Sequence, residues 1–324
     1  MPGPPLPPDR PDELDPDRFA AHHAEVRGTR LELLHEGAGR GGVPLLALHG
    51  WPETRRIWWR AVPLLVAAGF EVVAPDLRGF GGSGLGADGR GDVVAHALDM
   101  AALLAQLGER LGHDRWVVAG GDLGGPVGLE LALRERGLVD RAALFNSPLP
   151  RLSDEQTAGR DGRPLRALPD AGALDYFVRQ GRDADGLAAE LSTPAARQDY
   201  VAGFYGPRGW AAPGAFDAAA AAFHAAPFAD AASFRATLRT YESVFDRDLR
   251  TERPVFAADP DLRVLVLHGT ADGVVAPDFG ELAVRAYPNA VGPVLLDGCG
   301  HFVQWEAAED LVAHLTAFCS DLLG

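Results

Sequence analysis

Short apolar segments alternate with helical patterns over most of this chain, and this alternation narrows its fold more than any other feature. The segments predicted as strands are Val43–Leu48, Phe70–Pro75, Trp116–Ala119, Ala142–Phe145, Arg263–Leu267 and Val294–Leu296. Helical patterns occupy residues 54–68, 93–107, 124–136, 277–286 and 306–323. Short apolar strands that are separated by helices form a parallel sheet buried on both faces. The sequence therefore predicts an α/β fold.

The alternation is interrupted between residues 150 and 255, where no comparable apolar segment occurs. This stretch contains four of the five tyrosines and is predicted as helices and loops inserted into the core. We therefore divide the chain into a Pro/Asp-rich leader (1–20), an α/β core (21–149 and 256–324) and a helical cap (150–255). Seven prolines in the first 16 residues indicate an extended or disordered leader.

The charged residues exclude several classes of function. The 324 residues include 45 acidic and 30 basic side chains, so the net charge is −15, and every basic side chain is an arginine. A chain without lysine has no Schiff-base lysine and no lysine-containing phosphate loop. The acidic balance also disfavours binding to nucleic acid. A G-x-G-x-x-G match at residues 79–84 is not followed directly by a helix, so we do not interpret it as a dinucleotide site.

The two cysteines, Cys299 and Cys319, have neither disulfide-framework nor zinc-site spacing. No segment approaches the ~18 apolar residues of a membrane span, and the N-terminus lacks the apolar region of a signal peptide. We therefore expect a cytoplasmic protein that binds neither a membrane nor nucleic acid. A homodimer is compatible with the sequence, which does not determine the oligomeric state.

A glycine-rich turn between a predicted strand and a predicted helix is the strongest indication of catalysis. It is Gly120-Gly121-Asp122-Leu123-Gly124-Gly125. A nucleophile elbow has this context, because flanking glycines permit the strained turn that exposes the central side chain. Here that side chain is Asp122, and no G-x-S-x-G occurs elsewhere. The turn alone leaves helix capping open as the role of Asp122.

Two further polar side chains follow later strands. Asp272 lies in the segment HGTAD, and His301 lies in GCGHF. Because ligands bind outside the carboxyl ends of the strands in such sheets, we expect both to converge with Asp122. The order nucleophile, acid, histidine is that of the α/β-hydrolase triad.

The segment HGWPE follows the first predicted parallel strand. We predict that the backbone N–H groups of Trp51 and Leu123 form an oxyanion hole. We also place His49, Pro52 and, from the cap, Trp210 in the substrate pocket.

Together, the segments HGWPE, DLRGFGGSG, GGDLGG, HGTADG and GCGHF resemble the α/β-hydrolase superfamily. Within it they resemble the epoxide hydrolases and the haloacid and haloalkane dehalogenases, whose nucleophile is an aspartate. The resemblance covers nearly the whole chain after the leader. It implies a helical cap over the active site and a cis peptide bond before Pro52.

An aspartate nucleophile suits displacement at a saturated carbon atom, which gives an alkyl–enzyme ester. Water activated by His301, with Asp272 orienting the imidazole, then attacks the Asp122 carbonyl carbon. Acyl substrates are disfavoured, because attack on an ester would give an anhydride. The mechanism requires a small-molecule substrate and no metal or organic cofactor.

The leaving group distinguishes members of this branch. Haloalkane dehalogenases typically carry a tryptophan directly after the nucleophile, and fluoroacetate dehalogenases carry arginines just after the elbow. This chain has Leu123 and then Gly124-Gly125-Pro126-Val127. Both differences favour an epoxide hydrolase that forms a vicinal diol.

Epoxide hydrolases need phenol donors from the cap to activate the oxirane oxygen. Tyr241 resembles the second family tyrosine, whereas the first position corresponds to Ala173. We assign Tyr176 as its replacement, with Tyr205 and Trp210 as alternatives. A dehalogenase with the same covalent mechanism, a specialised biosynthetic enzyme and a ligand-binding receptor remain alternatives, because fold alone does not determine function.

Overall fold

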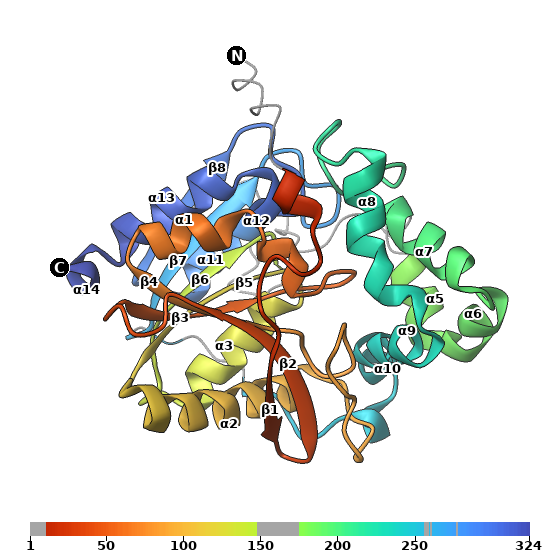
Figure 1. Cartoon of the computed structure of the whole chain (residues 1–324), viewed down its shortest axis with the longest axis horizontal. Coiled ribbons are helices and arrows are strands. Elements are labelled where there is room, and N and C mark those ends of the chain that lie inside the picture. The colour runs from red at the N-terminus through yellow and green to blue at the C-terminus, as the bar shows by residue number, and fades with distance from the viewer. Residues whose placement is uncertain (1–10, 148–174, 256–258, 260, 277) are drawn as a thin grey trace.

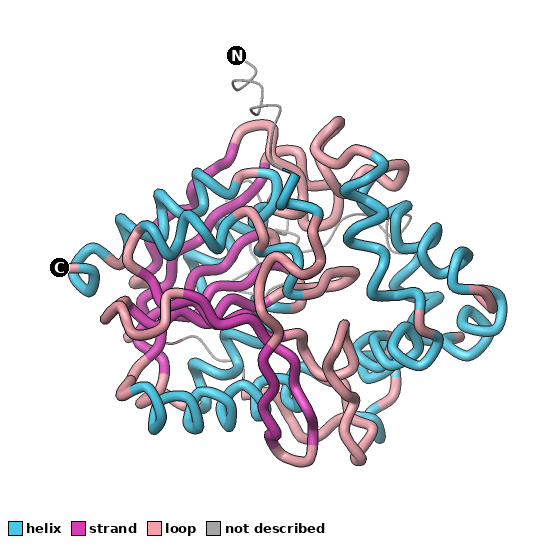
Figure 2. The backbone as a smooth tube through the Cα atoms, viewed as in Figure 1, coloured by secondary structure: helices cyan, strands magenta, loops and turns pink. Residues whose placement is uncertain are grey.

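The structure is a computed structural model that describes residues 11–147, 175–255, 259, 261–276 and 278–324. Its centre is one sheet with helices on both faces (Figures 1 and 2), so the predicted α/β fold is confirmed. The strand order is β1-β2-β4-β3-β5-β6-β7-β8, and the pairs from β4 to β8 are parallel. The strands are β1 (His22–Val26), β2 (Thr29–Glu36), β3 (Val43–Leu48), β4 (Phe70–Pro75), β5 (Trp116–Gly121), β6 (Val139–Phe145), β7 (Arg263–Gly269) and β8 (Ala290–Leu296).

Core helices cover the two faces of this sheet. Helices α1 and α13 pack together on one face, and α2 and α3 pack together on the other (Figure 1). Every residue of β4 and β5 is buried between these layers, which explains why both sequences are apolar apart from Glu71, whose carboxylate pairs with His35 and His113. The core helices are α1 (Ala61–Ala67), α2 (Val93–Leu111), α3 (Gly124–Arg134), α11 (Phe279–Ala286), α12 (Val303–Glu306), α13 (Ala308–Phe318) and α14 (Ser320–Leu323).

The first two strands form an antiparallel hairpin that the apolar pattern does not predict. In β2, buried and exposed residues are mixed, so its sequence TRLELLHE contains no continuous apolar run. The turn lies at Arg27 and Gly28, which both have positive φ, at 50° and 75°. Two consecutive positive φ values are typical of the tight turns that join hairpin strands.

Residues 175–255 fold as helices and loops at one side of the sheet (green to teal in Figure 1). Three of the helices begin at side chains that accept a backbone N–H bond: Thr193 caps α7, Asp217 caps the alanine-rich α8, and Asp230 caps α9. The described elements of this region are α5 (Asp175–Arg182), α6 (Ala184–Glu190), α7 (Pro194–Ala202), the 3₁₀ turns η4 (Gly203–Tyr205), η5 (Ala226–Ala229) and η6 (Arg247–Leu249), α8 (Ala218–Ala225), α9 (Ala231–Thr237) and α10 (Arg239–Phe245).

The described part of the leader packs against the core. The sequence instead predicted an extended or disordered leader. After the 3₁₀ turn η1 (Pro11–Leu14), the Asp15 carbonyl accepts a bond from the Trp59 indole, and the Phe19 ring packs edge-on against Trp59 at 5.0 Å. Glu13 forms an ion pair with Arg60 at 3.1 Å. Residues 1–10 of the predicted leader lie outside the described residues.

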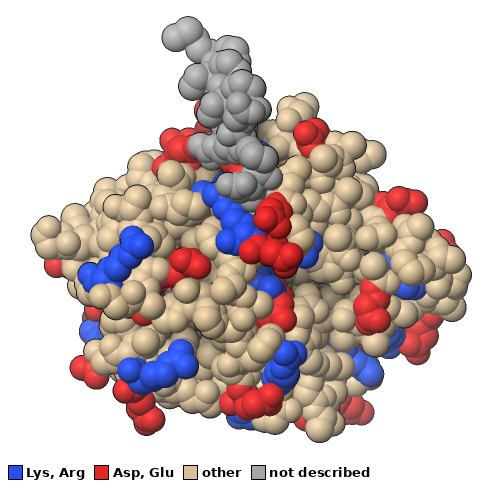
Figure 3. Space-filling view, in the orientation of Figure 1, with Lys and Arg blue, Asp and Glu red and all other residues tan. Residues whose placement is uncertain are grey.

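Figure 3 shows arginine and acidic side chains interspersed on one face of the molecule. Many arginines of the described residues pair with acidic side chains, as Arg179 of α5 does at 2.7 Å with Asp183, the residue after this helix. Among the helices of the described residues, none has both the length and the apolarity that crossing a bilayer requires.

Candidate active site

Asp122 occupies the turn between β5 and α3, with φ at +45°. Such a backbone conformation is uncommon for a residue with a Cβ atom and occurs where the surrounding structure imposes it. Here the glycines beside it allow close packing: a Cβ atom at Gly120 would lie 2.5 Å from the Gly124 carbonyl oxygen. The turn therefore presents the Asp122 carboxylate, 15% exposed, above the carboxyl edge of the sheet.

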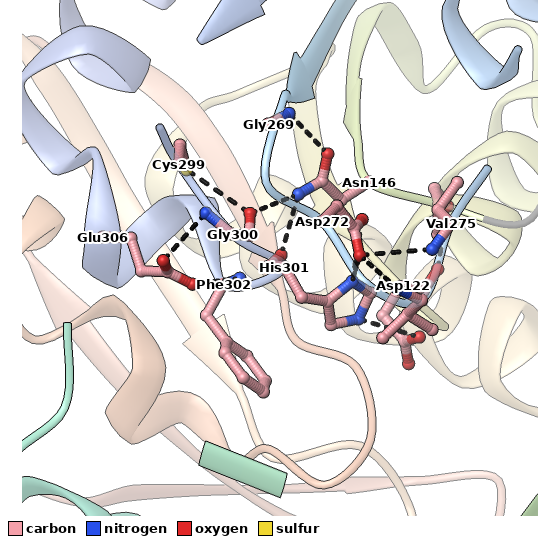
Figure 4. A network of polar contacts seen from close by, with 12 residues as sticks. Asp122, Asn146, Gly269, Asp272, Val275, Cys299, Gly300, His301, Phe302 and Glu306 are labelled. Atoms are coloured by element: carbon pink, nitrogen blue, oxygen red, sulfur yellow. Dashed lines mark hydrogen bonds and ion pairs between the residues drawn. The ribbon is translucent and has the colours of Figure 1, made fainter. Parts of the chain in front are cut away.

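His301 lies between the two carboxylates. Its Nε2 atom is 3.3 Å from Asp122 Oδ2, and its Nδ1 atom is 3.1 Å from each oxygen of Asp272. The backbone N–H groups of Val274 and Val275 donate to Asp272 Oδ1, at 2.7 and 3.2 Å, and so hold this carboxylate in place. The structure thus brings the three residues of the predicted triad together, as Figure 4 shows.

The two carboxylates determine the charge of His301. Burial by itself lowers the pKa of this imidazole, but the ion pairs and hydrogen bonds with Asp272 and Asp122 outweigh burial and raise its pKa well above the usual value. Loss of the Asp122 charge removes part of this effect. The raised pKa favours the positively charged form of His301, and neutralisation of Asp122 would make this imidazole a better base.

The Trp51 N–H donates to Asp122 Oδ1 at 2.8 Å, as an oxyanion-hole donor would. The Trp51–Pro52 peptide bond is cis. Leu123 immediately precedes α3, and no bond from its N–H to Asp122 occurs among the described residues. Of the two predicted oxyanion-hole donors, Trp51 therefore bonds the Asp122 carboxylate, and Leu123 does not among the described contacts.

A cavity of about 210 Å³ lies beside Asp122. Its described lining is mainly apolar and contains no cationic side chain; it consists of Trp51, Val93, Asp122, Leu123, Pro126, Tyr176, Phe177, Thr240, Tyr241, Val244, Val274 and Val275. Tyr176 and Tyr241 both line it, and no described residue is a hydrogen-bond partner of either hydroxyl. Burial, with the negative charge of Asp122, raises the pKa of both phenols well above 10, so both remain protonated donors.

The sequence profile of the alpha/beta hydrolase fold matches residues 43–308. The chain belongs to the α/β-hydrolase fold family. This match includes the strands and loops that carry Asp122, Asp272 and His301.

Within this family the chain is similar to epoxide hydrolases. It is 26% identical to epoxide hydrolase A of Mycobacterium tuberculosis over 92% of this chain and 96% of that protein. It is 37% identical to the soluble epoxide hydrolase of a Corynebacterium species, but that match spans only 39% of this chain and 41% of that one. The solved structure of epoxide hydrolase CorEH without ligand has the same fold, with a TM-score of 0.74 at 24% identity, covering 94% of this chain and 99% of that one.

Three residues of this α/β-hydrolase that were predicted to line the pocket do not line the described cavity. His49 is buried behind it, where Nε2 accepts from Leu77 N and Nδ1 donates to the Gly50 carbonyl, so it positions the HGWPE loop instead. The Pro52 carbonyl accepts a bond from the Tyr205 hydroxyl. Trp210 lies behind the cavity wall, with its ring 4.9 Å from that of Tyr176 and 5.2 Å from that of His301.

Of the alternatives for the first cap donor, Tyr205 is committed to Pro52, whereas Tyr176 lines the cavity. Ala173, the position that corresponds to the first family tyrosine, lies outside the described residues.

Glu53, the last residue of the segment HGWPE, has a role at this site that the sequence did not predict. Glu53 Oε2 accepts from Gly50 N at 2.7 Å and from Gln304 Nε2 at 2.9 Å. Burial, and next the charge of Asp122, raise the pKa of Glu53 to about 8. The sequence feature that could have indicated this role is the position of Glu53, two residues after Trp51, the predicted oxyanion-hole donor.

Proposed function

We propose that this α/β-hydrolase opens an epoxide to a vicinal diol through an ester on Asp122. One observation carries the proposal: Asp122 faces a cavity lined by two phenols that have no hydrogen-bond partner among the described residues, while His301 Nε2 lies 3.3 Å from Asp122 Oδ2. A nucleophile, acids for the leaving oxygen and a base for water thus meet at one site. The similarity to epoxide hydrolases supports the same reaction.

In the first half-reaction, Asp122 Oδ2 attacks one carbon of the oxirane ring, and the bond between that carbon and the ring oxygen breaks. Tyr176 or Tyr241 gives its phenolic proton to the oxygen as negative charge develops there. Oδ1 remains on the Trp51 N–H group at 2.8 Å, which leaves Oδ2 as the attacking atom. The phenolate regains a proton as His301 loses its own.

In the second half-reaction, neutral His301 takes a proton from water, whose oxygen bonds to Asp122 Cγ. Oδ1 becomes the oxyanion and is stabilised by the Trp51 N–H. The Cγ–Oδ2 bond then breaks, and the departing alkoxide takes the proton from His301 to complete the diol. The new Asp122 carboxylic acid protonates His301, which restores the resting ion pair.

The cavity favours an uncharged, apolar epoxide over a halogenated substrate. Its described lining offers no cation for a carboxylate, as a haloacid would need. The Trp51 indole N–H, which could hold a halide, already donates to Thr237 Oγ1 at 3.2 Å. The two phenols, by contrast, match the oxygen that an opening oxirane develops.

The reaction is tested by supplying a styrene-type epoxide, a 1-haloalkane and a haloacetate in parallel. Diol formation without halide release supports the proposal, whereas halide release identifies a dehalogenase. Turnover of none of the three, with ligand binding unchanged in Asp122→Asn, would contradict an enzymatic role. Asp114→Asn is the matched control, because Asp114 is exposed and precedes β5, whereas the elbow follows that strand.

The covalent intermediate is tested separately. His301→Gln should permit attack but trap the ester, giving a mass increase equal to one substrate on a peptide that contains Asp122. Single turnover of the unmodified enzyme in oxygen-18 water should place the label in the Asp122 carboxylate. Label found only in the diol would rule out the ester. The matched control for His301→Gln is His22→Gln, because His22 is an exposed histidine at the start of β1.

A further inference from the structure

Asn146, the first residue after β6, connects all three segments that carry the triad. It is fully buried. Its Oδ1 atom accepts from Gly269 N at 2.8 Å, three residues before Asp272. Its Nδ2 atom donates to the carbonyls of Gly300 and His301, at 2.7 and 3.1 Å, and its own carbonyl accepts from Asp122 N at 3.0 Å. Figure 4 shows the side chain between these loops.

The amide of Asn146 fits its surroundings in one orientation only. An N–H group lies on its oxygen side and two carbonyl oxygens lie on its nitrogen side, so a flipped amide would oppose like groups at every contact. Asn146 also has φ at +40°, which asparagine tolerates better than most residues. Both the backbone and the side-chain contacts therefore suit this residue type.

The next residue completes the connection to the elbow. Ser147 Oγ donates to the Asp122 carbonyl at 2.8 Å. The dipeptide Asn146-Ser147 thus pairs the backbone N–H and the backbone carbonyl of Asp122, while the Asn146 side chain reaches the other two loops.

The histidine loop has other supports that do not set its position relative to the elbow. Glu306 accepts from Gly300 N and Phe302 N, and the Trp210 carbonyl accepts from His301 N. A change at Asn146 therefore leaves the loop bonded to Glu306 of α12 and to Trp210 of the cap, but without the side-chain bonds from the end of β6.

We propose that Asn146 is a positioning residue of this site: its amide holds the Asp272 and His301 loops in register with the Asp122 elbow. The inference rests on the proposed two-step reaction. Ring opening uses Asp122 and the cap phenols, whereas ester hydrolysis also requires His301 at the correct distance from Asp122. Loss of the Asn146 amide therefore slows ester hydrolysis more than ester formation.

Two variants test this. Asn146→Asp keeps the shape but replaces the donor by an oxygen that faces two carbonyls, and Asn146→Gly keeps the positive φ without a side chain. Quenched-flow mass spectrometry measures formation and decay of the ester in single turnovers. We expect decay to slow about a hundredfold, as a misplacement near 1 Å does, while formation changes little and the ester accumulates. Asn289→Asp, the same change at an exposed residue before β8, should behave as the unmodified enzyme.

Equal slowing of both steps would reduce Asn146 to a general structural role, and an unchanged decay rate would also overturn the inference. Amide hydrogen exchange gives a readout that needs no turnover: residues 268–273 and 298–304 should exchange faster in Asn146→Gly than in the unmodified protein. If the unmodified protein forms neither diol nor ester, the proposed function fails. Faster exchange in these two segments would then still support the positioning role, and unchanged exchange would contradict it.

Discussion

The indole ring of Trp51 lies parallel to the phenol ring of Tyr176, with the ring centroids 5.9 Å apart and the planes 8° apart. The backbone N–H of the same tryptophan donates to Asp122 Oδ1 at 2.8 Å. The Tyr241 ring also packs against this indole, nearly perpendicular to it, with the ring centroids 5.4 Å apart. Trp51 of the core therefore contacts both phenols of the cap and the carboxylate of Asp122.

Replacing these phenols should affect ring opening. We expect Tyr176→Phe and Tyr241→Phe each to lower kcat/KM for an epoxide at least about tenfold, and the double variant by about 10²–10⁴, because the departing oxygen then lacks an acid. Steady-state diol formation measures this. Tyr200→Phe is the control, since its hydroxyl accepts from Gln180 Nε2 and does not line the described cavity. Full activity in the double variant would remove the phenols from the mechanism.

The charge of Asp122 should be visible in the titration of His301. Because Asp122 contributes to the raised pKa of His301, Asp122→Asn should lower that pKa, while Asp272 keeps part of the elevation. The imidazole resonances followed by NMR against pH report this directly. Asp114→Asn should leave the titration unchanged. An unaltered pKa in Asp122→Asn would contradict the proposed release of the base by ester formation.

Much of this arrangement could be predicted from the sequence because its signals are local. A buried parallel strand is a continuous apolar run, and the elbow needs glycines on both sides of Asp122. Strand β2 was not predicted, because buried and more exposed residues are mixed along it. A continuous apolar run therefore identifies the buried parallel strands but not the antiparallel strands at the edge of the sheet.

The roles of His49 and Asn146 could not be predicted, because they depend on contacts between distant segments. A histidine after a strand can turn toward the cavity or away from it, and His49 turns away because Leu77 N, 28 residues further along, donates to its ring. Asn146 acts through Gly269 and Gly300, more than 120 residues away in sequence. No spacing rule indicates such pairs.

The close packing of Gly50 against Asp122 leads to a third prediction. A Cβ atom at Gly50 would lie 2.3 Å from Asp122 Cβ and 2.6 Å from Oδ1. We therefore expect Gly50→Ala to displace the carboxylate from the Trp51 N–H and to lower kcat about 10²–10³-fold, as loss of an oxyanion donor does. Gly137→Ala meets no atom within 4 Å and should retain activity. Comparable kinetics in both variants would show that Asp122 tolerates the displacement.

Glu53 makes the stability of the protein depend on pH. Its pKa in the folded state is about 8 against an ordinary 4.5, so between these values the folded protein holds a proton that the unfolded chain has lost. The free energy of unfolding therefore falls as pH rises through this range, by at most about 1.4 kcal/mol per pH unit for one proton. Glu53→Gln should flatten this slope in urea unfolding between pH 5 and 8.5, whereas Glu109→Gln, exposed on α2, should preserve it. If the slope is the same in Glu53→Gln and the unmodified protein, Glu53 is ionised in the folded state and does not carry the proton assigned to it.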